Sequence, residues 1–182
     1  MKIFAVYTNV TLTQKPDWLD DFRSRYDEPY PYHVTLKMPC DIKEAQVSEI
    51  KNLLSKLFSK PGNSIELTFN SLRIDDETSD DVCIMIDAEK NDKIIQLQKD
   101  VLRTLSKYNQ YHKEKYQEYE KDFKPHITIA RNLDEHSYAM ASTELKQDFR
   151  CKGIITEVVL GIVDNLNATE ANNPKNQTIY SI

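Results

Sequence analysis

The sequence predicts one domain of alternating strands and helices, arranged as two halves with the same β-α-β-α-β order. The chain of 182 residues is too short for two domains that each bury an independent core. Apolar residues make up 40% of it and charged residues 29%, a balance that is typical of globular chains. Segments with strand and helix patterns follow one another in the same order twice, in halves of about residues 1–74 and 81–182.

The first half begins with a dense apolar run, which predicts a buried strand. Pro16 and Asp17 then predict the start of a short helix, because proline fits the first helical turn and an acidic residue there complements the helix dipole. A brief strand between two prolines, a long amphipathic helix and an alternating strand with one wet face complete this half. In chain order, these elements are expected over residues 2–8, 16–26, 33–37, 43–59 and 65–69.

The second half repeats this order. It contains a buried strand, an amphipathic helix, a brief strand after Pro125, a second helix with an acidic start and a long final strand. In chain order, these are expected over residues 82–86, 92–108, 126–130, 134–147 and 153–163, with a closing strand over 177–182. Residues 73–81 and 165–176 are expected to be loops, and residues 109–122 either prolong the preceding helix or form a flap beside the second brief strand.

The composition argues against several classes of protein. The apolar runs are far shorter than a membrane-spanning helix, and the N-terminus has no signal-peptide pattern. Three widely spaced cysteines indicate neither a disulfide framework nor a cysteine-based zinc site. A net charge of −5 disfavours broad attraction to a long nucleic acid, but it is compatible with a local phosphate pocket. We therefore expect a cytoplasmic protein that inserts in no membrane, and we expect it to act as a monomer.

Each brief strand begins with a His-x-Thr tripeptide, His33-Val34-Thr35 in the first half and His126-Ile127-Thr128 in the second. Because side chains alternate across a strand, each histidine projects on the same face as its threonine. If a pseudo-two-fold relates the halves, the two pairs face one another across a cleft. One neutral imidazole can then take a proton from a nucleophile while the other, protonated, gives one to a leaving oxygen. The threonine hydroxyls can donate to phosphate oxygens, whose charge grows in the transition state.

Other side chains near the tripeptides are candidate substrate ligands. Arg131 and Lys37 closely follow the two tripeptides, and each can contact phosphate or serve as an ordinary surface charge. Tyr32, like Tyr7 and Tyr30, can stack on a nucleobase or act as a packing residue with a wet hydroxyl. This chemistry requires no metal and no other cofactor.

The two tripeptides and their flanks resemble the paired motifs of the two-histidine (2H) phosphoesterase superfamily. The resemblance rests on the local sequences of residues 33–37 and 125–131. Residues 22–37 and 132–137 look most like the branch of bacterial 2'-5' RNA ligases and cyclic-nucleotide phosphodiesterases. The resemblance implies a bilobal α+β fold in which two antiparallel sheets face one another across a central cleft.

Carried over by position, the resemblance implies that His33 and His126 form an acid/base pair and that Thr35 and Thr128 donate to the phosphate. Arg131 matches a basic position that often follows the second motif. The implied activity is metal-independent hydrolysis, or in reverse ligation, of 2',3'-cyclic or 2'-5' phosphodiester bonds. The expected substrates are RNA ends, cyclic nucleotides or short oligonucleotides.

Three alternatives remain open on the sequence. The enzyme can degrade cyclic or 2'-5'-linked oligonucleotide signals, since an acidic net charge suits a small ligand. A non-catalytic module that holds RNA ends or nucleotides would keep the cleft, although a binder has no need for two proton-transfer groups. A divalent metal site on the two histidines is disfavoured, because no carboxylate or cysteine accompanies them at a recognisable ligand spacing.

Overall fold

The computed structural model describes residues 1–60, 62–75, 82–146 and 150–182. The strands are β1 (Lys2–Asn9), β2 (Thr11–Gln14), β3 (His33–Ile42), β4 (Ile65–Asp75), β5 (Val82–Ala88), β6 (His126–Leu133), β7 (Cys151–Ile155), β8 (Glu157–Val163) and β9 (Gln177–Ser181). The helices are α1 (Trp18–Tyr26), α2 (Val47–Leu57), α3 (Asp92–Thr104), α4 (Tyr116–Lys121), α5 (Glu135–Glu144) and α6 (Ala168–Ala171). Two short 3₁₀ helices lie at Glu44–Gln46 and Pro174–Asn176.

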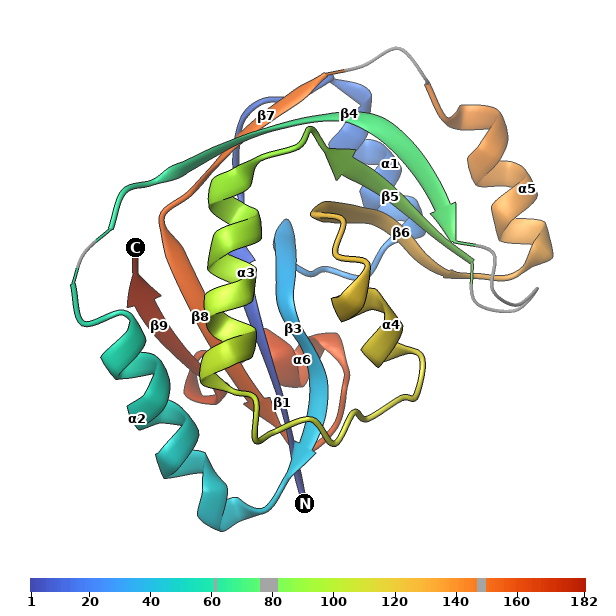
Figure 1. Cartoon of the computed structure of the whole chain (residues 1–182). Helices are drawn as coiled ribbons and strands as arrows, with labels where there is room; N and C mark the ends of the chain where they lie inside the picture. Colours follow the sequence, from blue (N-terminus) through green and yellow to red (C-terminus); the bar gives the residue numbers. More distant parts are fainter. Residues whose placement is uncertain (61, 76–81, 147–149) are drawn as a thin grey trace.

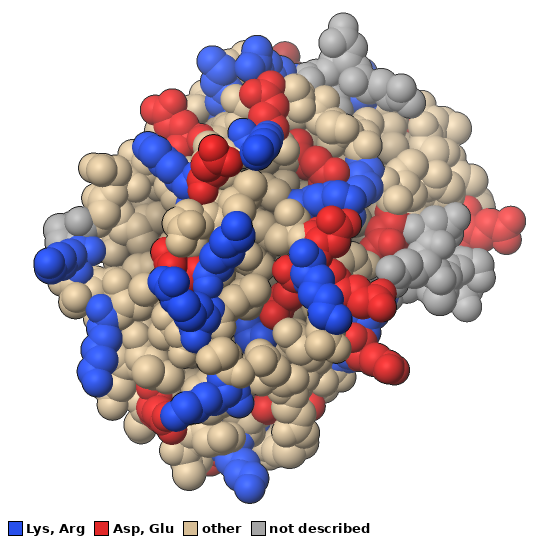
Figure 2. Space-filling view, viewed as in Figure 1, with Lys and Arg blue, Asp and Glu red and all other residues tan. Residues whose placement is uncertain are grey.

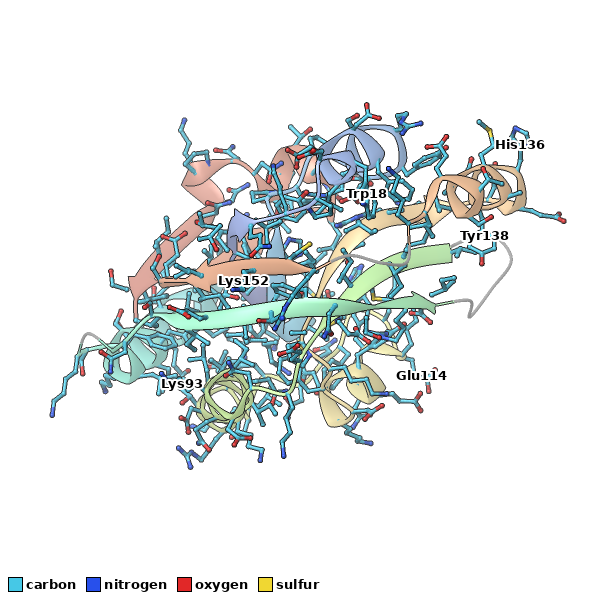
Figure 3. The ribbon with its side chains drawn as sticks, turned by 90° about the horizontal axis from the view of Figure 1, so that it is seen from above. Trp18, Lys93, Glu114, His136, Tyr138 and Lys152 are labelled. Atoms are coloured by element: carbon cyan, nitrogen blue, oxygen red, sulfur yellow. The ribbon has the colours of Figure 1, made fainter. Side chains whose placement is uncertain are left out.

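The strands form two antiparallel sheets, with orders β3-β1-β8-β9 and β2-β7-β4-β5-β6. In Figure 1 the strands of the first sheet rise through the lower part of the molecule, and β4, β5 and β6 of the second sheet lie above them. Figure 3 shows the molecule from above: α1, marked by the Trp18 label, and α3, marked by the Lys93 label, lie on opposite sides of β4 and β7. The predicted α+β class, with two antiparallel sheets across a central cleft, is confirmed.

The strand pairing interlocks the two halves of the sequence. Around the brief strands, the pairing is equivalent in the two halves: β3 pairs with β1, and β6 pairs with β5. However, β4, the last strand of the first half, pairs with β5 and β7 in the second sheet. In return, β8 from the second half pairs with β1 in the first sheet. Each sheet thus contains two strands from the other half of the chain, β8 and β9 in the first sheet and β2 and β4 in the second.

The prediction of one long strand over residues 153–163 is wrong. The chain leaves the second sheet after Ile155 and enters the first sheet as β8 one residue later. An apolar run does not mark such a change of sheet, because both strands are buried. Gly153 on β7 reflects the tight packing before the change: a Cβ there would come within 2.5 Å of Val10 Cγ1, so the missing side chain lets β7 lie close to the segment that enters β2.

Several element ends also differ from the predictions. β3 continues through Pro39, because this strand lies at the edge of its sheet and its pairing with β1 is irregular there, so a missing N–H is tolerated. β4 extends to Asp75, so the start of the predicted loop over 73–81 is strand, and residues 76–81 lie outside the described residues. The helices predicted over 43–59, 92–108 and 134–147 are shorter, the predicted loop over 165–176 contains α6 and a 3₁₀ helix, and β2 was not predicted.

The core contains apolar side chains from both sheets and from the helices that cover them. Fully buried residues on α2 and α3 contribute, among them Ile50, Leu54, Ile94 and Val101. These are the inward positions of the amphipathic patterns that predicted the two helices. Among the described residues, no helix is long and apolar enough to cross a membrane.

Candidate active site

The two His-x-Thr tripeptides begin β3 and β6 and line one cavity of about 530 Å³. His33 and Thr35 come from the first sheet, and His126 and Thr128 come from the second. The residue between each histidine and its threonine is buried in the core, so strand alternation turns both polar pairs toward the cavity. Among the described groups, neither threonine hydroxyl has a hydrogen-bond partner, which leaves both hydroxyls available to a ligand.

Each histidine ring is held by the backbone carbonyl two residues before it. Nδ1 of His33 lies 2.9 Å from the carbonyl oxygen of Pro31, and Nδ1 of His126 lies 2.8 Å from that of Lys124. A carbonyl oxygen only accepts hydrogen bonds, so Nδ1 donates in both contacts. This tautomer leaves Nε2 of each ring as the atom that can exchange a proton with a ligand.

His33 lies among aromatic rings. The ring of Tyr7 meets it edge-on with centroids 5.4 Å apart, and the ring of Tyr30 does so at 6.0 Å. Burial lowers the pKa of His33 to about 4, and the positive charge of Arg131 also acts to lower it. His33 is therefore neutral at pH 7, with a lone pair on Nε2.

His126 lies beside an ion pair that the sequence did not predict. Arg73 on β4 binds Asp87 on β5 through two hydrogen bonds of 2.9 Å, from Nε to Oδ2 and from Nη2 to Oδ1. Nη2 of Arg73 also lies 3.2 Å from Nδ1 of His126. Burial lowers the pKa of His126, the guanidinium of Arg73 adds to this effect, and Asp87 opposes it. Arg73 falls in a predicted loop, and only the pairing of β4 with β5 brings it to the cavity.

Arg131 lines the cavity and is held from the first half of the chain. Its Nε lies 2.5 Å from Oδ1 of Asp27, and its guanidinium stacks over the ring of Tyr30 at 4.4 Å. The side chain of Asp27 is fully buried, and its other oxygen accepts from Arg23 at 2.6 Å. Arg23 in turn donates to the carbonyl of Tyr30, in the turn that leads to His33. Sequence reasoning missed Asp27 and Arg23, because only the fold brings α1 to β6.

A bulge in each of the strands β3 and β6 decides which side chains reach the cavity. In β3, the register shifts between Val6 and Tyr7 of the partner strand, so that two consecutive residues, Leu36 and Lys37, are both buried. In β6, the register shifts twice, and Ile129 and Ala130 are likewise both buried. The residue after each pair returns to the cavity, and in β6 that residue is Arg131.

Two predicted ligands do not lie at the cavity. Lys37 is a candidate phosphate ligand on the sequence, but the bulge turns its side chain away from the cavity, and its Nζ binds Glu120 at 3.0 Å in a buried ion pair. Tyr32 lies against α1, where its hydroxyl donates to Asp20 at 3.0 Å and its ring stacks under the Arg23 guanidinium. Tyr30, not Tyr32, is the tyrosine of this turn that reaches the site.

Residues 109–122 form one wall of the cavity and do not prolong α3. After α3, the chain runs along β3: the Gln110 carbonyl accepts from Asp41 N–H at 2.7 Å, and His112 N–H donates to the Pro39 carbonyl at 2.9 Å. α4 follows and lines the cavity together with the residues next to it. Figure 1 shows α4 beside β3 and below β6. In the first half the corresponding connection spans only residues 27–32, so the cavity is walled asymmetrically.

The surface on this side of the molecule is mixed in charge. Figure 2 shows Lys and Arg side chains interspersed with Asp and Glu over the face that carries α3 and α4. Within the cavity, cationic and anionic residues also alternate, and Lys124 pairs with Asp122 at 2.9 Å. Across the part of the chain that the structure describes, no three His, Cys, Asp or Glu side chains gather as metal ligands.

Comparison with known proteins relates the chain to phosphoesterases. The sequence model of the 2'-5' RNA ligase superfamily matches residues 13–166. A protein of Geobacillus thermodenitrificans (strain NG80-2) that carries the provisional name phosphoesterase is 31% identical over 136 residues, which span 71% of this chain and 70% of that protein.

Solved structures share the fold along the whole chain. TT0787 of Thermus thermophilus matches with a TM-score of 0.59 at 14% identity, over 100% of this chain and 95% of that chain. E. coli LigT in complex with 3'-AMP matches with a TM-score of 0.56 at 11% identity, again over 100% of this chain and 95% of that chain. Kluyveromyces marxianus Usb1 with uridine monophosphate matches with a TM-score of 0.58 at 8% identity, over 99% of this chain and 98% of that chain. At these identities the likeness concerns the fold alone.

Proposed function

Because this chain belongs to the 2'-5' RNA ligase superfamily, we propose that it is a metal-independent phosphodiesterase that acts on 2',3'-cyclic or 2'-5' phosphodiester bonds. The substrates are RNA ends or small nucleotides, and ligation is the same reaction in reverse. One observation carries the proposal: two His-x-Thr pairs from different sheets line a single cavity, each with Nε2 free for proton transfer.

In hydrolysis, the two histidines act as a base and an acid at the same phosphorus. One neutral imidazole takes a proton from water as the water oxygen forms a bond to phosphorus. The bond from phosphorus to the ribose oxygen breaks, and the protonated imidazole gives its proton to that oxygen. The two roles exchange in ligation, in which a ribose hydroxyl replaces water.

The remaining cavity residues supply charge and hydrogen bonds to the phosphoryl group. The hydroxyls of Thr35 and Thr128 donate to the non-bridging oxygens, whose charge grows in the transition state. The guanidinium of Arg131 adds a fixed positive charge, and because Asp27 holds its Nε, the two terminal nitrogens remain for the phosphate. Such preorganised donors stabilise the transition state without reorganising during the reaction.

The size and charge of the site favour a small or single-ended substrate over a long RNA. A cavity of about 530 Å³ is within the range of sites for small ligands. The mixed charge of the surrounding face and the net charge of −5 offer little general attraction to a polyanion. Two neighbours in fold, LigT and Usb1, were solved with nucleoside monophosphates, which supports a nucleotide at this position.

The test is turnover of nucleoside 2',3'-cyclic phosphates, 2'-5'-linked oligoadenylates and cyclic oligonucleotides, with excess chelator present. We expect the wild type to cleave at least one of them, and His33→Ala and His126→Ala each to lower kcat by about 100-fold or more. Binding of the substrate should persist in both variants. A wild type that binds nucleotides and turns over none of them would instead indicate a binding module, and activity lost to chelator would indicate a metal site.

A further inference from the structure

Lys37 lies two residues after Thr35 and takes part in a buried polar network. Its side chain is fully buried, and Nζ lies 3.0 Å from Oε2 of Glu120 and 3.0 Å from Oδ1 of Asn109. The ammonium also lies over the ring of Tyr111, 4.4 Å from its centroid. A buried ammonium is tolerated only when such partners replace its hydrating water, and this network supplies them to Lys37.

Glu120, the partner of Lys37, is the last but one residue of α4, and its carboxylate is equally well satisfied. It accepts from Met38 N–H at 2.7 Å and from the Tyr111 hydroxyl at 2.6 Å, in addition to Lys37. Its backbone carbonyl accepts from the buried side chain of Gln98 on α3 at 3.3 Å. β3 and the segment before α4 therefore meet at the carboxylate of Glu120, and α3 binds its backbone carbonyl.

This network replaces the apolar face that usually fixes a helix. Glu120 is the buried residue of α4, and no apolar side chain of this helix is buried. A six-residue helix is also too short to be stable by itself. The Tyr119 hydroxyl also donates to Asp75 on β4, but the attachment of α4 to β3 runs through Lys37, Tyr111 and Glu120, which we call the α4 anchor.

The wall held by the α4 anchor is aromatic on its cavity side. Tyr116, Tyr119 and Phe123 line the cavity, and Met38, which donates to Glu120, lines it from β3. Aromatic rings are the usual contact surfaces for nucleobases. If the His-x-Thr pairs hold the reacting phosphate, the nucleoside attached to it can extend against this wall.

We infer that the α4 anchor is a positioning device that fixes α4 as the nucleoside-binding wall, so that Lys37 and Glu120 govern substrate affinity and not the chemical step. The identity of the ligand rests on the proposed function, whereas the attachment of α4 does not. Lys37 thereby acts on the site from the core, although its ammonium does not reach the phosphate.

Hydrogen exchange tests the attachment without reference to activity. Lys37→Met removes the ammonium and leaves Glu120 as an uncompensated buried charge, which favours release of α4. We expect amide exchange over residues 109–121 and at Met38 to accelerate by about 10-fold or more, with unchanged exchange in β1 and β8. Exchange that stays at the wild-type rate over 109–121, or that rises equally throughout the chain, would overturn the inference.

Two further variants separate release of α4 from general damage. Lys37→Met/Glu120→Gln removes both charges but keeps an acceptor oxygen for Met38 N–H, and the new amide NH2 can donate to the Tyr111 oxygen, so protection of residues 109–121 should return to within about 3-fold of the wild type. Tyr111→Phe keeps the ion pair and loses the two hydrogen bonds of the Tyr111 hydroxyl, to Glu120 and from Lys37, so it gives the same local pattern at smaller amplitude if Lys37→Met fails to fold. Lys107→Met is the matched control, because it makes the same change at an exposed position outside the cavity.

Kinetics test the role of the wall. For a nucleoside 2',3'-cyclic phosphate, Lys37→Met should raise KM by about 10-fold with kcat within about 2-fold, and the double variant should restore KM. For ribose 2',3'-cyclic phosphate, which has no base, KM should stay unchanged. Equal loss of kcat on both substrates would overturn the role in affinity. If the wild type cleaves neither substrate, the proposed function fails, while hydrogen exchange still decides whether the anchor holds α4.

Discussion

Asp27 links the two halves of the site through a single buried carboxylate. One oxygen holds Arg131 on β6, and the other holds Arg23 on α1, which in turn fixes the Tyr30 carbonyl beside the turn that orients His33. Two arginines on one carboxylate satisfy its charge without water, which explains how a fully buried acid is tolerated. Asp27 is therefore a positioning residue for both sides of the cavity.

Asp27→Asn should release Arg131 while preserving the volume of the side chain. We expect kcat/KM to fall by about 10-fold to 100-fold, close to the effect of Arg131→Ala. Because the two residues would act through one interaction, Asp27→Asn/Arg131→Ala should be no worse than Arg131→Ala alone. Steady-state kinetics of the three variants check this, with the exposed Asp21→Asn on the same helix as control; additive losses would contradict it.

In the proposed mechanism, the pKa values of the two histidines set the pH dependence of kcat/KM. Productive free enzyme has one ring neutral and the other protonated, so kcat/KM falls once the more basic ring loses its proton. Burial lowers the pKa of His126, and lowers that of His33 to about 4, so both lie below the usual value of about 6.5. We expect kcat/KM to peak between about pH 4 and 6.5 and to be about 10-fold or more lower at pH 8. A profile that is flat from pH 6 to 8 would contradict it.

At the scale of the element, local patterns predicted the existence of strands and helices but not where strands bend or change sheets. The bulges in β3 and β6 show why this affects the site. Simple alternation places Lys37 on the same strand face as Thr35, and it places Arg131 on the other face of the strand from Thr128. One extra residue in each strand reverses both assignments, and bulges depend on the pairing with neighbouring strands, which a single sequence does not reveal.

Gly153 provides a test of packing between elements. A Cβ at this position would meet Val10 Cγ1 at 2.5 Å and Leu12 Cδ2 at 3.2 Å, and the branched valine has little room to move. Gly153→Ala should therefore lower the free energy of unfolding by about 1–3 kcal/mol. Urea unfolding measures it, with Gly161→Ala as control, since a Cβ there makes only an ordinary contact at 3.4 Å. Equal stabilities of the two variants would rule out the close contact between Gly153 and Val10.

At the scale of the molecule, the exchange of strands makes the two halves of the sequence interdependent. The second sheet contains β2 and β4 from the first half, and the first sheet contains β8 and β9 from the second half, so unfolding either sheet disrupts strands from both halves. The cavity has one histidine on each sheet, so its geometry depends on both. Interlocked sheets around one core should behave as a single cooperative unit.

We expect one unfolding transition for the whole chain. Trp18, the single tryptophan, packs edge-on against Phe22 on α1, and its fluorescence reports on that region. Far-UV circular dichroism reports on all strands and helices together. The two probes should give the same midpoint in urea. Separate midpoints would indicate that the halves fold independently, as two domains.

The sequence by itself determined the order of most strands and helices and the presence of two His-x-Thr tripeptides, because periodicity and short motifs are local properties of the chain. The α+β class followed from the resemblance that these tripeptides carry. The sequence also placed each histidine on the same face as its threonine, since they are two residues apart in a strand. The tertiary structure alone decided the partners: Arg73 beside His126, Asp27 behind Arg131, Lys37 in the α4 anchor and the division of residues 153–163 between sheets. These depend on strand pairing and bulges, which are set by contacts between residues far apart in sequence.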